Sequence, residues 1–221
     1  MTPSRANVTP FRQARKCALR SEASVSNARK LPQAVIAMTR DLNQIEGQRL
    51  RLRLVQPDDA GYIHGLRKDP RYNQHLSAVT GTVGDQRLWI ERYKDREAQG
   101  CEFYFLIERR DDGTPCGVVR LYDITEDSFT WGSWILDHNK PPKSALESAV
   151  LSFGVGFEQL GLPMALVEVR IGNDHALAFY RRLGMTELRR DDRDIYFIFP
   201  RARLEADRTE YMAILQKARE K

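Results

Sequence analysis

Cysteine is scarce in this 221-residue sequence: Cys17, Cys101 and Cys116 form no C-x-x-C pair, and no histidine stands at metal-ligand spacing beside them. This pattern excludes a dense disulfide framework and argues against a zinc site. Apolar runs of membrane length and internal repeats are absent as well. We therefore expect a protein of a reducing cytoplasm, with no metal and no membrane partner.

Excess positive charge is also missing from most of the chain. The formal net charge is +5, but residues 1–37 alone carry seven Lys or Arg against one acid, Glu22. Residues 38–221 are left with 28 basic and 29 acidic residues, a net charge of −1. General binding of nucleic acid needs a basic surface, so we expect no nucleic-acid partner.

The hydrophobic content of 42% suits one domain of ordinary core size with extensions. We predict a basic, largely disordered extension over 1–47, a folded domain over 48–200 and a helical tail over 201–221. The acid-poor start also resembles an organellar transit peptide, while Met38 opens a natural start. Whether residues 1–37 belong to the native product therefore stays open.

Alternating apolar residues, helical spacing and turn signals predict a chain of intermixed strands and helices, an α+β fold. The segment LRLRLV at 50–55 alternates strictly, and Asp111-Asp112-Gly113 marks a hairpin turn. Helical spacing covers 57–69 and 86–98. The predicted strands are 50–55, 102–108, 116–123, 129–136, 165–171, 186–190 and 195–199.

The stretch 131–185 predicts strand, loop, helix, strand and helix, with a turn signal at each junction. Ser144 and Glu147 form a predicted capping box at the start of the first helix, and Gly161 ends that helix. Trp131 and Trp134, three residues apart in one strand, are expected on opposite faces. The apolar stripe of this helix is Leu146, Val150, Phe153, Phe157 and Leu160.

A second helix follows the strand at 165–171. Gly172 and Asn173 break that strand, and Asn173 or Asp174 can cap the helix. Both helices thus begin just after a strand end. A helix N-terminus offers free amides and about half a positive charge, so each is a place for phosphate. Lys140 and Lys143 add charge at the first of them.

These two segments resemble the acyl-CoA-binding core of the GNAT family of N-acetyltransferases. Residues 140–145, KPPKSA, are similar to its Gln/Arg-x-x-Gly-x-Gly/Ala loop, with Lys143 in place of the first glycine and Lys140 in place of Gln/Arg. Asn173, Ala176 and Tyr180, followed by LGM at 183–185, are similar to the family's N-x-x-A-x-x-x-Y-x-x-x-G-F/M ending. The resemblance implies a GNAT fold, with a mixed central sheet of about six to seven strands and helices on both faces. It also implies that the fourth and fifth strands are splayed to hold acyl-CoA.

The reaction that the resemblance implies is attack of a neutral amine on the thioester of acetyl-CoA. It assigns a backbone amide near Ile135 or Leu136 to the developing oxyanion, and Tyr180 to protonation of the thiolate. A purely structural, core role for Tyr180 is the alternative. The resemblance also implies that acetyl-CoA contacts Lys140, Lys143, Ser144, Ala145, Asn173, Ala176 and Tyr180.

Glu168 is our candidate for the base that keeps the amine deprotonated. It is flanked by valines in the strand 165–171, where desolvation would raise its pKa towards a useful value. Alternate polar residues also mark a strand face open to solvent, however. An exposed Glu168, with water as the base, is therefore the equal alternative.

A further segment bears on the identity of the acceptor amine. The segment GVVRLYDI at 117–124 resembles the GNAT enzymes that acetylate nucleotide-linked amino sugars for surface glycans, and we favour that acceptor. The alternatives are a protein N-terminus, as in the RimJ/RimL-type branch, another small amine, or a non-catalytic CoA-binding relic. The expected partners are acetyl-CoA and a small amine, and a homodimer is one option for the assembly.

Overall fold

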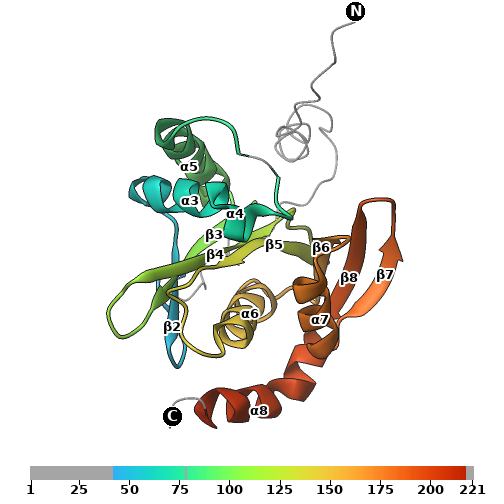
Figure 1. The fold of residues 1–221 in the computed structure, drawn as a ribbon. Helices are drawn as coiled ribbons and strands as arrows, with labels where there is room; N and C mark the ends of the chain where they lie inside the picture. The colour runs from blue at the N-terminus through green and yellow to red at the C-terminus, as the bar shows by residue number, and fades with distance from the viewer. Residues whose placement is uncertain (1–41, 78, 218–221) are drawn as a thin grey trace, which may run out of the picture.

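A computed structural model describes residues 42–77 and 79–217 of the chain. The expectations for residues 1–37, and for most of the predicted extension 1–47, fall outside these residues. An eight-stranded sheet runs through the described part in the order β1-β2-β3-β4-β5-β6-β8-β7 (Figure 1). The strands are β1 (Ile45–Glu46), β2 (Leu50–Leu54), β3 (Phe103–Arg109), β4 (Pro115–Tyr122), β5 (Ser128–Leu136), β6 (Met164–Arg170), β7 (Thr186–Arg190) and β8 (Asp194–Pro200).

The predicted mixed sheet is confirmed, with one strand more than expected. The seven predicted strands correspond to β2 through β8, and the added strand is the two-residue β1, which pairs with β2. Neighbouring strands are antiparallel except for β5 and β6, which are parallel. A parallel pair needs a crossover connection, and the helix after β5 supplies it.

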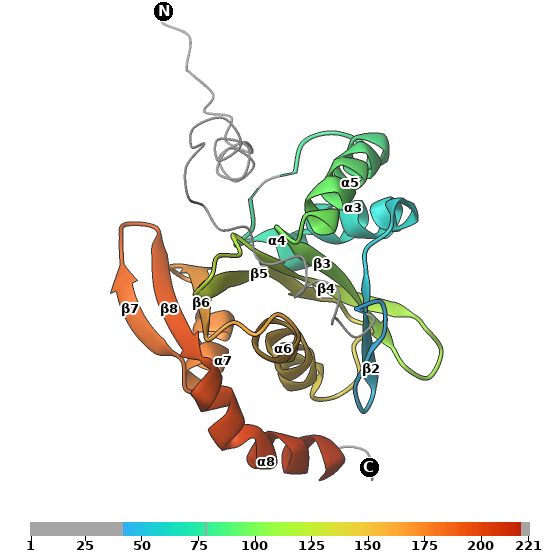
Figure 2. The same ribbon diagram turned by 180° about the vertical axis from the view of Figure 1, so that it is seen from behind.

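Helices cover both faces of the sheet. They are η1 (Pro57–Asp59), α3 (Ala60–Lys68), α4 (Pro70–Asn73), α5 (Val83–Ala98), α6 (Ser144–Gly154), the π-helix η2 (Val155–Gln159), α7 (Asp174–Arg182) and α8 (Arg201–Lys217). In both views, α3, α4 and α5 lie on one face, and α6, α7 and α8 lie on the other (Figures 1 and 2). Within the described residues, no helix is long and apolar enough to cross a membrane.

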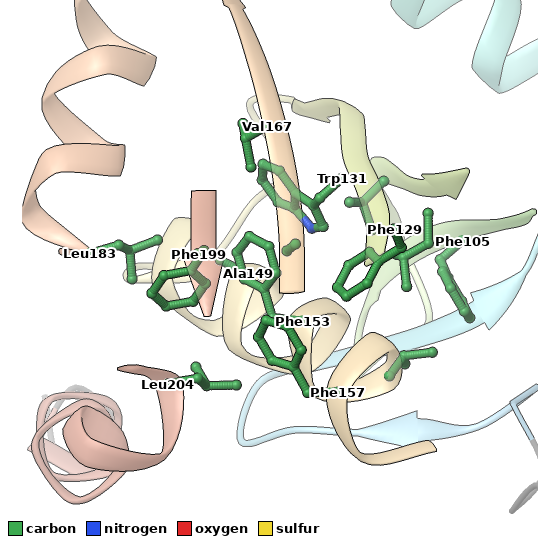
Figure 3. Close-up of a cluster of buried hydrophobic side chains, with 14 of the residues drawn as sticks. Phe105, Phe129, Trp131, Ala149, Phe153, Phe157, Val167, Leu183, Phe199 and Leu204 are labelled. Carbon is green, nitrogen blue, oxygen red and sulfur yellow. The ribbon is translucent and has the colours of Figure 1, made fainter. Parts of the chain in front are cut away.

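The larger hydrophobic core lies under α6, α7 and α8. Phe153 and Phe157 on the α6–η2 helix pack against Phe129 of β5 and Phe199 of β8, with ring centroids 5.0 to 6.5 Å apart (Figure 3). These two phenylalanines belong to the predicted stripe, and its other members are partly buried against the same core. The smaller core lies between α3, α5 and the opposite face of β3 and β4.

The helix after β5 departs from the single α-helix that the sequence predicts. Its last turn is the π-helix η2, which contains Gly156. A Cβ at Gly156 would lie 2.2 Å from the ring of Phe129, so only glycine lets the helix approach β5 this closely. A local widening of this kind accommodates one extra residue per turn. Close packing on the sheet therefore accompanies the irregular turn.

Candidate active site

The strands β5 and β6 part in the middle of the sheet. Their parallel pairing runs from Ser128–Met164 to Trp131–Val167 and then stops. Beyond that point β5 continues to Leu136 along β4, while β6 continues to Arg170 along β8. The gap thus lies between 132–136 of β5 and 168–170 of β6. This is the divergence that the resemblance predicted for its fourth and fifth strands.

A bulge in β5 lies at the start of this gap. Ser133 has a φ of 48°, in the left-handed region, and the register with β4 shifts between Val118 and Arg120. The shift brings Trp131 and Trp134 to the same face, where their ring centroids are 5.1 Å apart. The prediction that these two side chains lie on opposite faces is wrong, because one extra residue inverts the alternation.

Both tryptophans are held by serines of α6. Trp131 Nε1 donates to Ser152 Oγ at 2.8 Å, and Trp134 Nε1 donates to Ser148 Oγ at 3.1 Å. Phe179 of α7 closes the layer from the other side, with its ring centroid 5.1 Å from that of Trp134. An aromatic wall between α6 and α7 therefore borders the gap.

The start of α6 is built differently from the predicted capping box, which is wrong. Lys143 is the N-cap in a left-handed conformation, with a φ of 65°, and makes no side-chain cap. Ser144 Oγ donates instead to Pro141 O at 2.6 Å. The Glu147 carboxylate accepts from the backbone N–H groups of Arg49 and Leu50, at 2.8 and 3.1 Å. Glu147 thus ties α6 to β2 rather than to its own first turn.

The charges expected near this helix start are exposed. Lys140 and Lys143 both reach solvent, and Lys140 Nζ donates to Asp137 O at 3.1 Å. Ala145, in the first turn, is half-buried. No side chain among the described residues caps the start of α6, so backbone N–H groups of its first turn remain available. With the two lysines beside them, these N–H groups are suited to bind an anionic ligand.

The start of α7 agrees with the sequence prediction. Asn173 caps the helix by accepting a hydrogen bond from Ala176 N–H at 3.2 Å. Ala176 and Tyr180, one helical turn apart, both pack on the large core. The cap fixes the direction in which α7 leaves β6, and therefore where Tyr180 lies.

Tyr180 is buried among aromatic rings beside the gap. Its ring meets Trp131 edge-on at 6.0 Å and Phe197 at 5.9 Å. Burial, with a smaller contribution from Tyr122, raises the pKa of its hydroxyl well above the ordinary value, so the group is protonated at neutral pH. No described residue hydrogen-bonds this hydroxyl. Tyr180 is 6% exposed and is therefore almost wholly buried.

Glu168 lies on the opposite face of the sheet from its neighbours. Val167 and Val169 enter the large core, so Glu168 projects to the side of α3 and α5, where it is exposed. The flanking valines therefore do not enclose the Glu168 carboxylate. Partial desolvation, and then the nearby carboxylate of Asp194, still raise the pKa of Glu168 above its ordinary value.

Three residues near the gap were not singled out from the sequence. Arg120 of β4 is the register partner of Gly132, at the bulge. Tyr122 reaches across to the same glycine, where an added Cβ would lie 3.0 Å from the Tyr122 hydroxyl. Arg67 of α3 is the third, an electrostatic neighbour of Arg120. These three residues are brought together by tertiary pairing, which the sequence does not show. The segment GVVRLYDI, singled out for its resemblance, contains Arg120 and Tyr122 but gave neither a role.

Comparisons with known proteins agree with this geometry. A family model described as an acetyltransferase (GNAT) domain matches residues 49–186. The chain belongs to the GNAT acetyltransferase family. It is therefore an acyltransferase, and GNAT acetyltransferases use acetyl-CoA and an amine acceptor. The predicted family, fold and enzyme class are confirmed. Among the described residues no group of three or more His, Cys, Asp or Glu could hold a metal ion.

Solved structures similar to this GNAT chain extend the comparison. One described as apo FdhC, a nucleotide-linked sugar GNAT, is 40% identical with a TM-score of 0.73, and the match covers 78% of this chain and 98% of that one. A GNAT-family acetyltransferase from Bacillus anthracis is 15% identical with a TM-score of 0.61, covering 71% and 98%. The ribosomal-protein-S5-alanine acetyltransferase from Vibrio fischeri is 14% identical with a TM-score of 0.61, covering 70% and 94%. The comparison with curated proteins gives no match.

Proposed function

We propose that this GNAT enzyme transfers an acetyl group from acetyl-CoA to the amine of a nucleotide-linked amino sugar. The observation that carries the proposal is the 40% identity to FdhC over 98% of that chain, since FdhC is described as a nucleotide-linked sugar GNAT. The similarity to the S5-alanine acetyltransferase, at 14%, supports the common fold alone. The sugar acceptor is therefore favoured over a protein N-terminus.

We propose that the extended thioester arm enters the gap between β5 and β6, where the backbone of β5 supplies a hydrogen-bond donor to it. Asp137 N–H donates to Cys116 O at 2.9 Å, so that amide points towards β4. Amides alternate between the two edges of a strand, so the N–H of Leu136 points into the gap and that of Ile135 points to β4. We assign the hydrogen bond to the thioester carbonyl oxygen to Leu136. Lys140, Lys143, Ser144 and Ala145 would hold the CoA pyrophosphate at the start of α6, with Asn173 and Ala176 lining the start of α7.

Two side chains would move the protons. The acceptor nitrogen forms a bond to the acetyl carbon, the carbon–sulfur bond breaks, and the thiolate takes a proton. Tyr180 donates that proton, because its buried hydroxyl is protonated at neutral pH and is next to the gap. Glu168 accepts the proton that the amine loses, directly or through water, from the opposite face of the sheet. Oxygen substituents make a sugar amine less basic than an alkylamine, so a modest base is sufficient.

A panel of amines with acetyl-CoA tests the proposal. It includes nucleotide-linked amino sugars, the corresponding free amino sugars, polyamines and peptides with free N-termini. Thiol release gives the rate, and mass spectrometry gives the acetylated product. We expect the highest kcat/KM with a nucleotide-linked amino sugar. Faster turnover of peptides or polyamines than of every nucleotide-linked sugar refutes the acceptor. Stabilisation by acetyl-CoA without turnover of any amine favours a non-catalytic CoA-binding protein.

A further inference from the structure

A cluster of arginines lies over β3 and β4, on the face of the sheet that carries Glu168 and away from the start of α6. Arg96 of α5 and Arg120 of β4 both pair with Glu102, through N–O distances of 2.9 and 2.6 Å. One carboxylate thus serves two guanidinium groups. The two pairs leave one positive charge uncompensated before any further residue is considered.

Arg67, in the last turn of α3, adds a second uncompensated charge. Its side chain is half-buried and forms no ion pair within 42–77 and 79–217, and its one hydrogen bond there is to Ser77 O at 3.5 Å. Burial lowers the pKa of the Arg67 guanidinium, Tyr104 opposes this effect, and the like charge of Arg120 adds to it. A partly buried cation beside another cation is unfavourable unless an anion joins them.

Arg120 is fixed in place yet incompletely bonded. Three aromatic rings surround its guanidinium: Trp89 at 5.1 Å, Tyr104 at 5.5 Å and Tyr122 at 5.1 Å from Cζ to the ring centroid. Its Nε is fully buried and has no hydrogen-bond partner in the described part of the chain. A buried donor without an acceptor costs free energy, and such exceptions call for an explanation.

The cluster is close to the reacting position. Arg120 pairs in register with Gly132, at the bulge where β5 begins to leave β6. Adjacent strands lie about 4.8 Å apart, so the backbones of Arg120 and Gly132 are separated by one strand spacing. An anion held here would leave a sugar ring over Gly132, with its amine at the gap.

We propose that Arg67 and Arg120 form the binding site for the diphosphate of the acceptor, an inference that rests on the proposed nucleotide-linked substrate. Guanidinium groups bind phosphate oxygens through paired, charge-assisted hydrogen bonds. A bound dianion supplies the counter-charge that Arg67 lacks among the described residues, and its oxygens are hydrogen-bond acceptors for guanidinium donors. CoA carries a diphosphate as well, but the start of α6 lies on the other face of the sheet (Figures 1 and 2).

Calorimetric titration with inorganic pyrophosphate, in the presence of saturating CoA and without divalent cations, tests the site directly. Saturating CoA blocks the donor's own phosphate site. We expect saturable binding to the wild type, weakened about 10- to 100-fold in Arg67→Gln, as for a lost charge-assisted hydrogen bond. Arg67→Lys keeps the positive charge but loses the paired donors of the guanidinium group, so its affinity for pyrophosphate should lie between those of the wild type and Arg67→Gln. Lys68→Gln is the matched control: it removes one charge from the exposed neighbour on the same helix and should bind within about twofold of wild type.

Kinetics then separate this inference from the proposed function. With a nucleotide-linked amino sugar, Arg67→Gln should raise KM about 10- to 100-fold, while kcat/KM for the free amino sugar stays unchanged. Pyrophosphate binding that depends on Arg67, without turnover of any nucleotide-linked sugar, supports the anion site and refutes the proposed acceptor. Turnover of the nucleotide-linked sugar with equal KM in Arg67→Gln, or pyrophosphate binding that this variant leaves unchanged, overturns the anion site. The melting temperatures of the three variants show whether each remains folded.

Discussion

Removal of the Tyr180 hydroxyl separates catalysis from packing. Tyr180→Phe keeps the ring against Trp131, Phe179 and Phe197 and deletes one oxygen that no described residue hydrogen-bonds. We therefore expect the melting temperature to stay the same or rise slightly. If the hydroxyl protonates the thiolate, kcat should fall roughly 100-fold, the lower end of what a general acid contributes. That factor corresponds to about 2.7 kcal/mol of activation free energy.

The alkaline side of the wild-type pH profile tests the same group. Burial raises the pKa of Tyr180 above the ordinary value, so the acid form persists through the neutral and mildly alkaline range. The rate should therefore show no alkaline fall from this residue until the solution pH passes its raised pKa. A decline in kcat centred near neutral pH would assign the acid to some other group.

Tyr211→Phe is the matched control for the loss of a tyrosine hydroxyl. The Tyr211 hydroxyl on α8 lies 3.1 Å from its acceptor Leu183 O, in a buried hydrogen bond, and 3.2 Å from a second acceptor, the Asp207 carboxylate. Its loss should cost about 1 kcal/mol of unfolding free energy, or roughly 2 to 4 °C, with kcat unchanged. We therefore expect Tyr180→Phe to lose turnover but not stability, and Tyr211→Phe to lose stability but not turnover. Equal kcat for Tyr180→Phe and wild type would reduce Tyr180 to a core aromatic.

Three further substitutions test the remaining assignments. Lys143→Ala should weaken acetyl-CoA binding by about 1 to 2 kcal/mol, measured by calorimetry, and an unchanged affinity would show that this lysine does not contact the donor. Glu168→Gln should lower kcat/KM for a nucleotide-linked amino sugar about 100-fold with the acetyl-CoA affinity intact. For the wild type, kcat/KM should rise with pH through the raised pKa of Glu168 to a plateau. Identical pH profiles for the wild type and Glu168→Gln would exclude the Glu168 carboxylate as the base. Glu147→Ala should cost about 2 to 5 kcal/mol in chemical denaturation, because it leaves two backbone N–H groups unsatisfied, whereas Glu147→Gln keeps an acceptor and should cost less.

The elements of the fold could be predicted because their signals are local. Strict alternation in LRLRLV predicted β2, and the Asp-Asp-Gly turn predicted the β3–β4 hairpin. Asn173 followed by an apolar face predicted α7 together with its cap. In each case the residues that form the element also carry the pattern. The two-residue β1 has no such pattern, since its pairing with β2 alone defines it.

The capping box could not be judged from the sequence. Ser144 and Glu147 have the correct spacing, but the backbone N–H groups of Arg49 and Leu50 bind the carboxylate from nearly a hundred residues away along the chain. The first turn of α6 and the backbone of residues 49 and 50 compete for the Glu147 carboxylate as a hydrogen-bond acceptor. In the structure the carboxylate binds residues 49 and 50. The same limit applies to η2, whose irregular turn coincides with a close approach between Gly156 and Phe129.

The positions of the site side chains depend on features that no single segment encodes. The alternation rule placed Trp131 and Trp134 apart, and one bulged residue, Ser133, brought them together. That bulge lies where β5 leaves β6, so the break in the alternation coincides with the start of the gap between the two strands. A strand that obeyed the alternation throughout would direct Trp134 to the face of α3 and α5, across the surface on which Glu168 lies. We infer that the bulge keeps the acceptor face open, and that the irregularity which misled the sequence pattern is itself part of the site.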